Sequence, residues 1–193
     1  MGNVYHTKEE MIDCVNAFYE GMVQRSEEMK QHPNYKTGEN YAYLGLPPCF
    51  LIFDEYVAFF EMLGTKESVG LLSQLKKIVM LGRQAGYFLI VACQRPDAKY
   101  FSDGIRDNFN FRVGLGRISE LGYGMLFGSD VKKQFFQKRI KGRGYCDVGT
   151  SVISEFYTPL VPKGHDFLQT IGSLAQARQD GTATCEAKGD GTD

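Results

Sequence analysis

The sequence CFLIFDEY occupies residues 49–56, and the sequence YFLIVACQRPD occupies residues 87–97. Each opens with a short apolar run rich in β-forming residues, which predicts a buried strand. Between them, residues 66–84 carry apolar side chains at helical spacing, and Gly86 follows as a helix cap. A strand, a helix and a strand within about 45 residues make a βαβ unit, so the sequence predicts parallel strands, a right-handed crossover and an α/β fold.

The flanking sequence predicts further elements around this unit. Thr7 and Glu10 have the spacing of a capping box, and the apolar periodicity behind them predicts a helix over residues 8–30. Downstream, we expect short strands at residues 109–113, 144–147 and 152–157. The predicted organisation is an N-terminal helix and loop (1–45), a core (46–174) and a disordered tail (175–193), because the tail is almost free of apolar residues.

The composition limits the classes of protein to which the chain can belong. The chain has 193 residues, 43% of them hydrophobic, and a formal net charge of -1. Its five cysteines are scattered without a C-x-x-C pair, which argues against a disulfide framework or a zinc site. The sequence shows no signal peptide and no apolar run of about 20 residues. We therefore expect a soluble, cytoplasmic chain that makes no membrane contact of its own.

Positive charge is concentrated in one region. Residues 76–143 contain 14 Lys and Arg against 5 Asp and Glu, whereas the rest of the chain contains 8 against 18. The densest part, VKKQFFQKRIKGRGY at residues 131–145, has six cations and no acid. Such a segment is typical of a surface that contacts nucleic-acid phosphates. It is equally typical of a solvated helix face or a subunit interface, and the sequence leaves these alternatives open.

Asp54 and Glu55 end the first predicted strand. A buried strand holds such an acid pair rigidly, so that an Asp can reach a nucleotide-bound magnesium ion and a Glu can polarise an attacking water. The alternative is that the two acids simply end a strand in solvent.

Gln94 ends the second predicted strand, next to Arg95 and Pro96. An amide at the tip of a neighbouring strand can contact both a terminal phosphate and the attacking water. The alternative is a strand-to-loop turn that Pro96 terminates, which explains the proline but not the glutamine.

Four runs together resemble a known family. They are FLIFDEYVAFF (50–60), LKKIVMLGRQAGYFLIVACQRPD (75–97), IRDNFNFRVGLGRIS (105–119) and GRGYCDVGTSVISEFYTPLVP (142–162). In this order they resemble the C-terminal part of the motor domain of FtsK/SpoIIIE DNA translocases, over about residues 46–162. The sequences GRGY and PKGHDF are most similar to FtsK-like proteins of Gram-positive conjugative transposons.

The resemblance implies a RecA-like P-loop NTPase core, a mostly parallel sheet flanked by helices, with ATP and Mg²⁺ as cofactors. It implies that Asp54 is the magnesium-associated acid of the Walker B strand and that Glu55 is the catalytic base. Gln94 would sense the phosphate, so Asp54 and Gln94 would both contact the nucleotide. Arg112 or Arg117 would reach a neighbouring subunit's nucleotide as an arginine finger; the alternative for Arg112 is a structural ion pair.

The resemblance also implies partners. A ring of six identical subunits would surround double-stranded DNA, with Lys132, Lys133, Lys138 and Arg139 on its phosphates. The ring would serve conjugation or cell division machinery.

One element of the family pattern is absent from the sequence. The 193 residues contain no phosphate-binding G-x-x-x-x-G-K-[ST] loop, whose Lys and backbone N–H groups do most of the phosphate binding. We therefore expect the chain alone to bind ATP weakly and to be inactive. Three interpretations follow: a fragment of a translocase motor, a non-catalytic assembly or DNA-binding module of a ring or coupling complex, and an unrelated α/β enzyme that uses the Asp54–Glu55 pair. The third is the weakest, because the sequence offers no nucleophile or metal cluster to accompany the pair.

Overall fold

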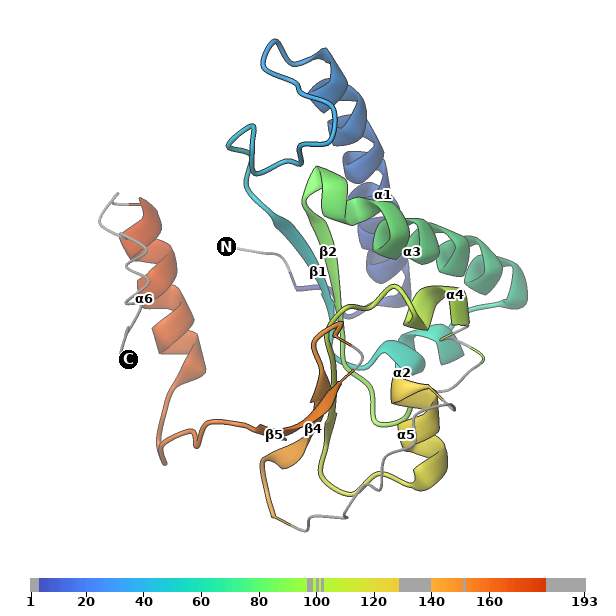
Figure 1. Ribbon diagram of the computed structural model, residues 1–193, viewed down its shortest axis with the longest axis vertical. Coiled ribbons are helices and arrows are strands. Elements are labelled where there is room, and N and C mark those ends of the chain that lie inside the picture. Colours follow the sequence, from blue (N-terminus) through green and yellow to red (C-terminus); the bar gives the residue numbers. More distant parts are fainter. Residues whose placement is uncertain are drawn as a thin grey trace. The chain divides into compact units, whose positions relative to one another are not determined.

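A computed structural model describes residues 4–96, 99, 101, 103–128, 140–150 and 152–179 (Figure 1). The chain divides into two compact units, one formed by Tyr5–Thr158 and the other by Met1–Val4 with Pro159–Asp193. The first unit holds the predicted βαβ unit and every residue of the candidate site that the structure describes.

Helix α1 spans Lys8–Gln31 and begins with the predicted capping box. The Thr7 hydroxyl accepts a hydrogen bond from the Glu10 N–H at 3.4 Å, and the Glu10 carboxylate accepts one from the Thr7 N–H at 3.3 Å. These bonds satisfy backbone donors that the first helical turn would otherwise leave free. The helix prediction is confirmed to within one residue at its C-terminus.

The βαβ unit is confirmed. Strand β1 (Cys49–Phe53) pairs with strand β2 (Tyr87–Val91) in parallel, and the register runs from Cys49↔Tyr87 to Phe53↔Val91. Two helices join the strands, α2 (Tyr56–Glu61) and α3 (Thr65–Ala85). The sequence did not predict α2, because its six residues are too short to establish a helical period.

Two glycines close the turn from α3 into β2. Gly86 caps the helix at φ 78°, a left-handed conformation that favours glycine. A Cβ on Gly82 would lie 2.2 Å from the Tyr87 carbonyl oxygen. The absence of a side chain there lets the last turn of α3 approach the start of β2.

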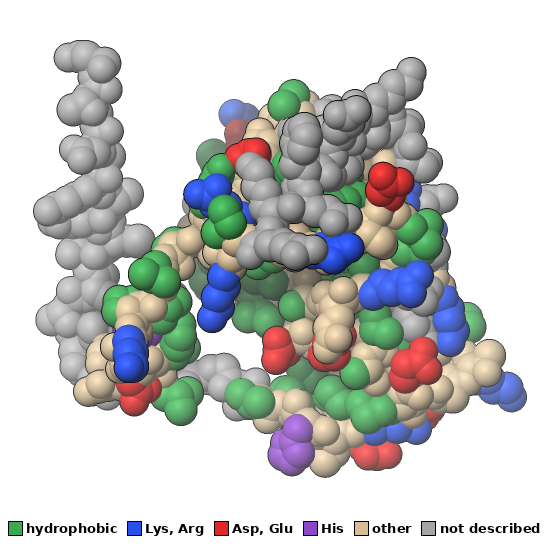
Figure 2. Space-filling view, turned by 90° about the horizontal axis from the view of Figure 1, so that it is seen from below, with side chains coloured by type: hydrophobic (Ala, Val, Ile, Leu, Met, Phe, Trp, Pro, Cys, Tyr) green, Lys and Arg blue, Asp and Glu red, His purple; other side chains and the backbone are tan. Residues whose placement is uncertain are grey.

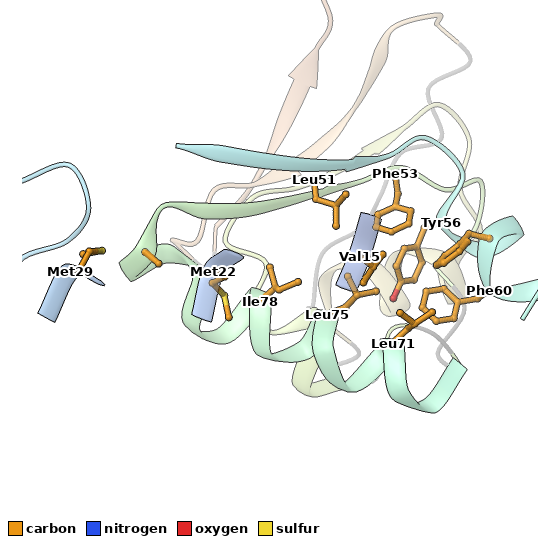
Figure 3. Close-up of a cluster of buried hydrophobic side chains, with 12 residues drawn as sticks. Val15, Met22, Met29, Leu51, Phe53, Tyr56, Phe60, Leu71, Leu75 and Ile78 are labelled. Carbon is orange, nitrogen blue, oxygen red and sulfur yellow. The ribbon is translucent and has the colours of Figure 1, made fainter. Parts of the chain in front are cut away.

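The main core lies between the β1–β2 sheet and helices α1 and α3 (Figure 3). Leu51 and Phe53 point from β1 toward these helices, which contribute side chains at helical spacing. The fully or nearly fully buried members are Val15, Met22, Met29, Tyr56, Phe59, Phe60, Leu71, Leu75, Ile78 and Ala85. Arg25 of α1 also binds the start of the unit, since its guanidinium donates to the Pro47 carbonyl at 2.7 Å and lies 4.7 Å from the Tyr87 ring centroid.

A second sheet is antiparallel. Its order is β3–β4–β5, formed by Arg112–Leu115, Arg143–Asp147 and Ile153–Tyr157. Helices α4 (Asp103–Arg106) and α5 (Glu120–Phe127) come directly before and after strand β3 in the sequence. Tyr123, Phe127, Tyr145 and Ile153 form a small core of their own.

The α/β fold class is confirmed, but the parallel portion is smaller than the expected "mostly parallel" sheet. Among the described strands only β1 and β2 run parallel. The five residues 148–152 between β4 and β5 are too few for a crossover, so the chain reverses and the strands pair antiparallel. Strand β3 also begins at Arg112, three residues later than predicted.

The second unit contains helix α6, Phe167–Gln179. We expected a disordered tail from residue 175, yet α6 continues five residues past that boundary. Ala175, Ala177 and Gln179 extend the helix because alanine and glutamine have high helix propensity. Residues 180–193 lie outside the described part of the chain. Across the described residues, no helix combines the length and apolar character needed to cross a bilayer.

A substitution at Leu75 tests how much the main core contributes to stability. Leu75→Ala should lower the free energy of unfolding by about 3 kcal/mol, because the side chain is 0% exposed and its removal leaves a cavity. The control is Val69→Ala on the same helix, where 64% exposure predicts a loss of about 0.5 kcal/mol or less. Urea unfolding measures both. Equal losses in the two variants would contradict the assignment of α3's buried face.

Candidate nucleotide-binding edge

The ends of β1 and β2 meet at one edge of the sheet. The Ala92 N–H donates to the Phe53 carbonyl at 2.8 Å, and the Tyr56 N–H donates to the Ala92 carbonyl at 3.0 Å. These bonds continue the parallel ladder past Phe53, on both sides of Asp54 and Glu55. The acid pair and Gln94 therefore follow adjacent parallel strands at the same carboxyl edge, which confirms the predicted arrangement.

The side chains at this edge differ in exposure. Asp54 and Gln94 are exposed, and Glu55 is half-buried. Glu55 occupies the N-cap position of α2, but its carboxylate makes no capping hydrogen bond. Its carboxylate is therefore not committed to the backbone of that helix.

Cys93 lies close to Glu55. Burial raises the pKa of the Cys93 thiol, and the negative charge of Glu55 raises it further. Cys93 therefore stays a neutral thiol at physiological pH and offers no nucleophile. Its effect here is to place an uncharged side chain beside the Glu55 carboxylate.

An aromatic cluster that begins at Tyr56 restrains the backbone of the acid pair. The Tyr56 ring centroid lies 5.5 Å from that of Phe53, 4.8 Å from that of Phe60 and 4.7 Å from that of Phe101. Tyr56 is almost fully buried, and this burial raises the pKa of its hydroxyl far above the usual value. Because the residue directly after Glu55 is anchored in this way, the backbone that carries both carboxylates has little freedom.

Asp54 has the chemistry of a ligand for a magnesium ion that is shared with a substrate. Within the ranges that the structure describes, no three His, Cys, Asp or Glu side chains group closely enough to hold a metal alone. Magnesium is usually bound through one or two carboxylates, several waters and substrate phosphates. An exposed aspartate at a strand end suits this mode, whereas it does not suit a metal cage made only of protein ligands.

A cleft of about 510 Å³ opens beside the edge. Its polar lining includes Gln94 from the end of β2 and three arginines, Arg106, Arg112 and Arg117. The structure thus brings Gln94, Arg112 and Arg117 around one cavity, as three of the residues that the sequence singled out. Asp54 and Glu55 do not line it.

Arg112 forms a buried ion pair inside its own chain. Its Nη2 donates to Asp147 Oδ2 at 2.5 Å, and its Nη1 donates to the Leu126 carbonyl at 3.2 Å. Asp147 is 3% exposed and also accepts from the Gly149 N–H at 2.9 Å. The geometry therefore agrees with the structural alternative for Arg112. Arg117 is exposed and has no ion pair with any residue of the described ranges, so the arginine-finger prediction now rests on Arg117.

The sequence did not predict that Asp147 pairs with Arg112 or that Arg106 lines the cleft. The sequence places Asp147 directly after the apolar GYC of its strand, which is a weak signal for a functional or paired acid. Its partner depends on the antiparallel register Arg112↔Asp147, which no local pattern encodes. Arg106 lies on the four-residue helix α4, which is too short to be predicted from periodicity.

The proposed DNA-contacting residues Lys132, Lys133, Lys138 and Arg139 lie outside the described residues. Of the same basic stretch, Lys141 and Arg143 are described, and the Arg143 guanidinium lies 4.7 Å from the Tyr157 ring centroid. On the face shown in Figure 2, the described basic side chains are interspersed with acidic and apolar ones. The DNA interface stays a prediction.

One curated relative supports the resemblance. The chain is 54% identical over 190 residues to the FtsK domain-containing protein YdcQ of Bacillus subtilis (strain 168). This match covers 98% of the chain but 39% of the relative's length. No protein-family model matches the chain.

Solved structures with a similar fold include a type VII secretion ATPase, a conjugation coupling protein and EssC (ATPases 2 and 3). The cytoplasmic domain of the Thermomonospora curvata type VII secretion ATPase EccC matches 84% of the chain at 20% identity with a TM-score of 0.60, over 19% of its own length. The pCW3 conjugation coupling protein TcpA, solved as a monomer with ATPγS, matches 85% at 18% identity with a TM-score of 0.62, over 49% of its length. EssC (ATPases 2 and 3) of Geobacillus thermodenitrificans matches 90% at 16% identity with a TM-score of 0.55, over 31% of its length. The resemblance to FtsK/SpoIIIE motor domains and the P-loop ATPase fold class are confirmed.

Two of the three arginines that line the cleft, Arg112 and Arg117, make a matched pair for a test. Arg112→Ala should lower the free energy of unfolding by about 3 kcal/mol or more, because it leaves the buried Asp147 carboxylate without its partner. Arg117→Ala, on an exposed side chain, should change it by about 0.5 kcal/mol or less. Denaturant unfolding of both variants provides the measurement. An Arg112→Ala protein as stable as the original would show that the ion pair contributes nothing to the fold.

Proposed function

Because the chain is a homologue of an FtsK domain-containing protein, we propose that it is the C-terminal part of an ATP-driven motor that translocates double-stranded DNA. The observation that carries the proposal is the position of Asp54, Glu55 and Gln94 at the ends of two adjacent parallel strands. In open α/β sheets, ligands bind outside the carboxyl ends of the strands. A nucleotide at this edge would contact an acid pair and an amide. Phosphoryl transfer to water uses such groups to hold the metal ion and to orient the attacking water.

Each residue has a proposed task. Asp54 would hold the magnesium ion, which neutralises charge on the phosphates when it is bound. Glu55 would accept a proton from the attacking water, because its carboxylate is half-buried and makes no capping bond. Gln94 would orient that water and contact the terminal phosphate. Arg117 would extend toward the nucleotide of a neighbouring subunit, since it is exposed and forms no ion pair with a described residue.

We further propose that the assembled motor is a homo-hexameric ring on the cytoplasmic side of the membrane, serving conjugation or chromosome segregation. The support is the kind of relative found: an FtsK domain-containing protein and, by fold, a conjugation coupling protein. The chain spans 39% of the length of the B. subtilis relative, so ring assembly and turnover are proposed for a full-length protein.

A second candidate is a non-catalytic module that joins such a ring or coupling complex. The observation in its favour is that the sequence has no G-x-x-x-x-G-K-[ST] loop. Without this loop, the 193-residue chain should bind ATP·Mg weakly.

Glu55→Gln tests the catalytic proposal. In a full-length protein that contains the phosphate loop, this variant should bind ATP as the original does but lose at least about 100-fold in turnover, because the amide cannot take the water's proton. The control is Glu61→Gln, which removes an exposed carboxylate at the end of α2. Steady-state ATPase assays and nucleotide titration give the two readouts. Unchanged turnover in Glu55→Gln would remove Glu55 from the mechanism and favour the non-catalytic module.

The basic stretch tests the DNA proposal. Changing Lys132, Lys133 and Lys138 to Ala in a ring-competent protein should reduce the slope of log affinity against log salt by about 2.7, at about 0.9 for each phosphate contact. Affinity should fall similarly for duplexes of different sequence, since phosphate contacts carry no base information. The control changes Lys30, Lys66 and Lys163, all exposed and outside the basic region. Equal salt slopes in both triple variants would indicate a solvated helix or a subunit interface instead.

A further inference from the structure

Helices α1 and α3 run side by side in the same direction, and both cover the same face of the β1–β2 sheet. Contacts at three successive levels show this arrangement. They join Lys8 to Glu67 at 3.0 Å, Tyr19 to Lys77 at 3.4 Å and Arg25 to Ala85 at 3.3 Å. Each residue of α1 is therefore level with the residue of α3 that comes 58 to 60 positions later in the sequence. Together the two helices present one outer surface, directed away from the sheet.

The part of this surface that α1 contributes is acidic. Glu9, Asp13 and Glu20 are exposed there, and none of them forms an ion pair with a residue that the structure describes. At about 100° per residue they lie within about 40° of one another around the helix, on the side opposite its buried residues. The cations of α1 are engaged in other contacts, Lys8 with Glu67, Arg25 with Pro47 and Lys30 with Glu27.

The part that α3 contributes is basic. Lys66, Lys76 and Lys77 are exposed, and within the described ranges none of them forms an ion pair. Glu67 is the one acid in the sequence of α3, and its carboxylate is bound to α1. Two apolar side chains, Val69 and Met80, are also exposed on this helix. We call the three acids of α1 and the three lysines of α3 the α1–α3 surface.

We propose that the α1–α3 surface is a two-fold interface between two copies of this chain, in which α1 of each copy lies on α3 of the other. A two-fold interface uses the same patch on both partners, so the patch must be complementary to itself. An acidic helix beside a basic helix meets this condition. Rotation by 180° about an axis parallel to both helices places each helix over the helix of opposite charge.

The relative level of the helices predicts the ion pairs. A rotation about an axis parallel to the helices leaves every residue at its own level. Lys76 is then level with residues 16–18 of the other copy, and Glu20 lies within one helical turn of them. Lys66 is level with residues 6–8, and Glu9 lies within one turn of these. Both pairs occur twice in the dimer because the interface is symmetric.

The two signs of charge identify the occupant as a second copy. A polyanion would be attracted to α3 but repelled by the acids of α1 beside it, and a basic partner would meet the reverse difficulty. Helices of 24 and 21 residues are about 36 Å and 32 Å long at about 1.5 Å per residue. Side by side at about 10 Å they offer a footprint of roughly 600 Å², less than the roughly 800 Å² per partner of a standard interface. We therefore expect a weak, reversible dimer.

Sedimentation of the 193-residue chain tests the dimer. The chain should show a monomer–dimer equilibrium at about 0.05 M NaCl, and about 0.5 M NaCl should weaken the association by about 10-fold or more, because salt screens exposed ion pairs. A chain that stays monomeric at low salt and high protein concentration overturns the inference. Assemblies larger than a dimer overturn the two-fold arrangement.

Charge reversal locates the interface. Glu20→Lys and Lys76→Glu each place like charges opposite one another at both symmetric contacts, so each variant alone should self-associate about 10-fold more weakly or worse. An equimolar mixture should form a heterodimer about as tight as the original dimer, because each variant supplies the charge that the other has lost. Failure of the mixture to restore association would show that these two residues do not meet.

Two exposed residues outside both helices provide the control. Glu120→Lys and Lys141→Glu make the same changes in net charge. Each should self-associate as the original chain does, both alone and mixed. Circular dichroism and thermal unfolding confirm that all four variants are folded. Equal weakening in the control variants would assign the effect to net charge and contradict the proposed interface. The α1–α3 surface does not include Asp54, Glu55 or Gln94, so the dimer does not depend on nucleotide binding.

Discussion

The parallel pairing of β1 with β2 is the constraint on which the candidate site depends. A parallel pair must be joined by a crossover, and here the crossover contains α3, whose apolar face covers the sheet together with α1. The same pairing brings the C-terminal ends of both strands to one edge. The residues that follow each strand, Asp54 and Glu55 on one and Gln94 on the other, are therefore neighbours because of the topology and need no contact between their side chains.

The rigidity of that edge comes from burial directly behind it. Tyr56 is anchored among Phe53, Phe60 and Phe101, and its backbone N–H is bonded to Ala92 of the neighbouring strand. Carboxylates that contact water or phosphate cannot be fixed by their own burial. An acid pair with such contacts therefore depends on buried side chains next to it in the sequence. The hydrophobic side chains before and after the pair hold it in place.

The sequence was sufficient for the βαβ unit because its signals are local. Short apolar strands, a periodic helix and a glycine cap all lie within residues 49–91, and the structure contains each of them at the predicted place. The second sheet was harder, because its pairing joins Arg112 to Asp147 across 35 positions and its register depends on the intervening chain. For that reason the sequence left two alternatives for Arg112 open, and only the register showed that its guanidinium has a buried partner within the chain.

The exposed surface of the β1–β2 sheet connects the fold to its proposed function. A two-stranded parallel sheet is small for an α/β core, and its outward face exposes Phe50 and Ile52. Parallel sheets are normally covered on both faces, whereas among the described elements α1 and α3 cover the opposite face of this one. Gln94 and Arg117 line the cleft beside the ends of these strands. If ATP binds at this edge as proposed, Asp54, Glu55 and Gln94 would contact it from one subunit and Arg117 from a neighbouring one, so that the site would be completed on assembly.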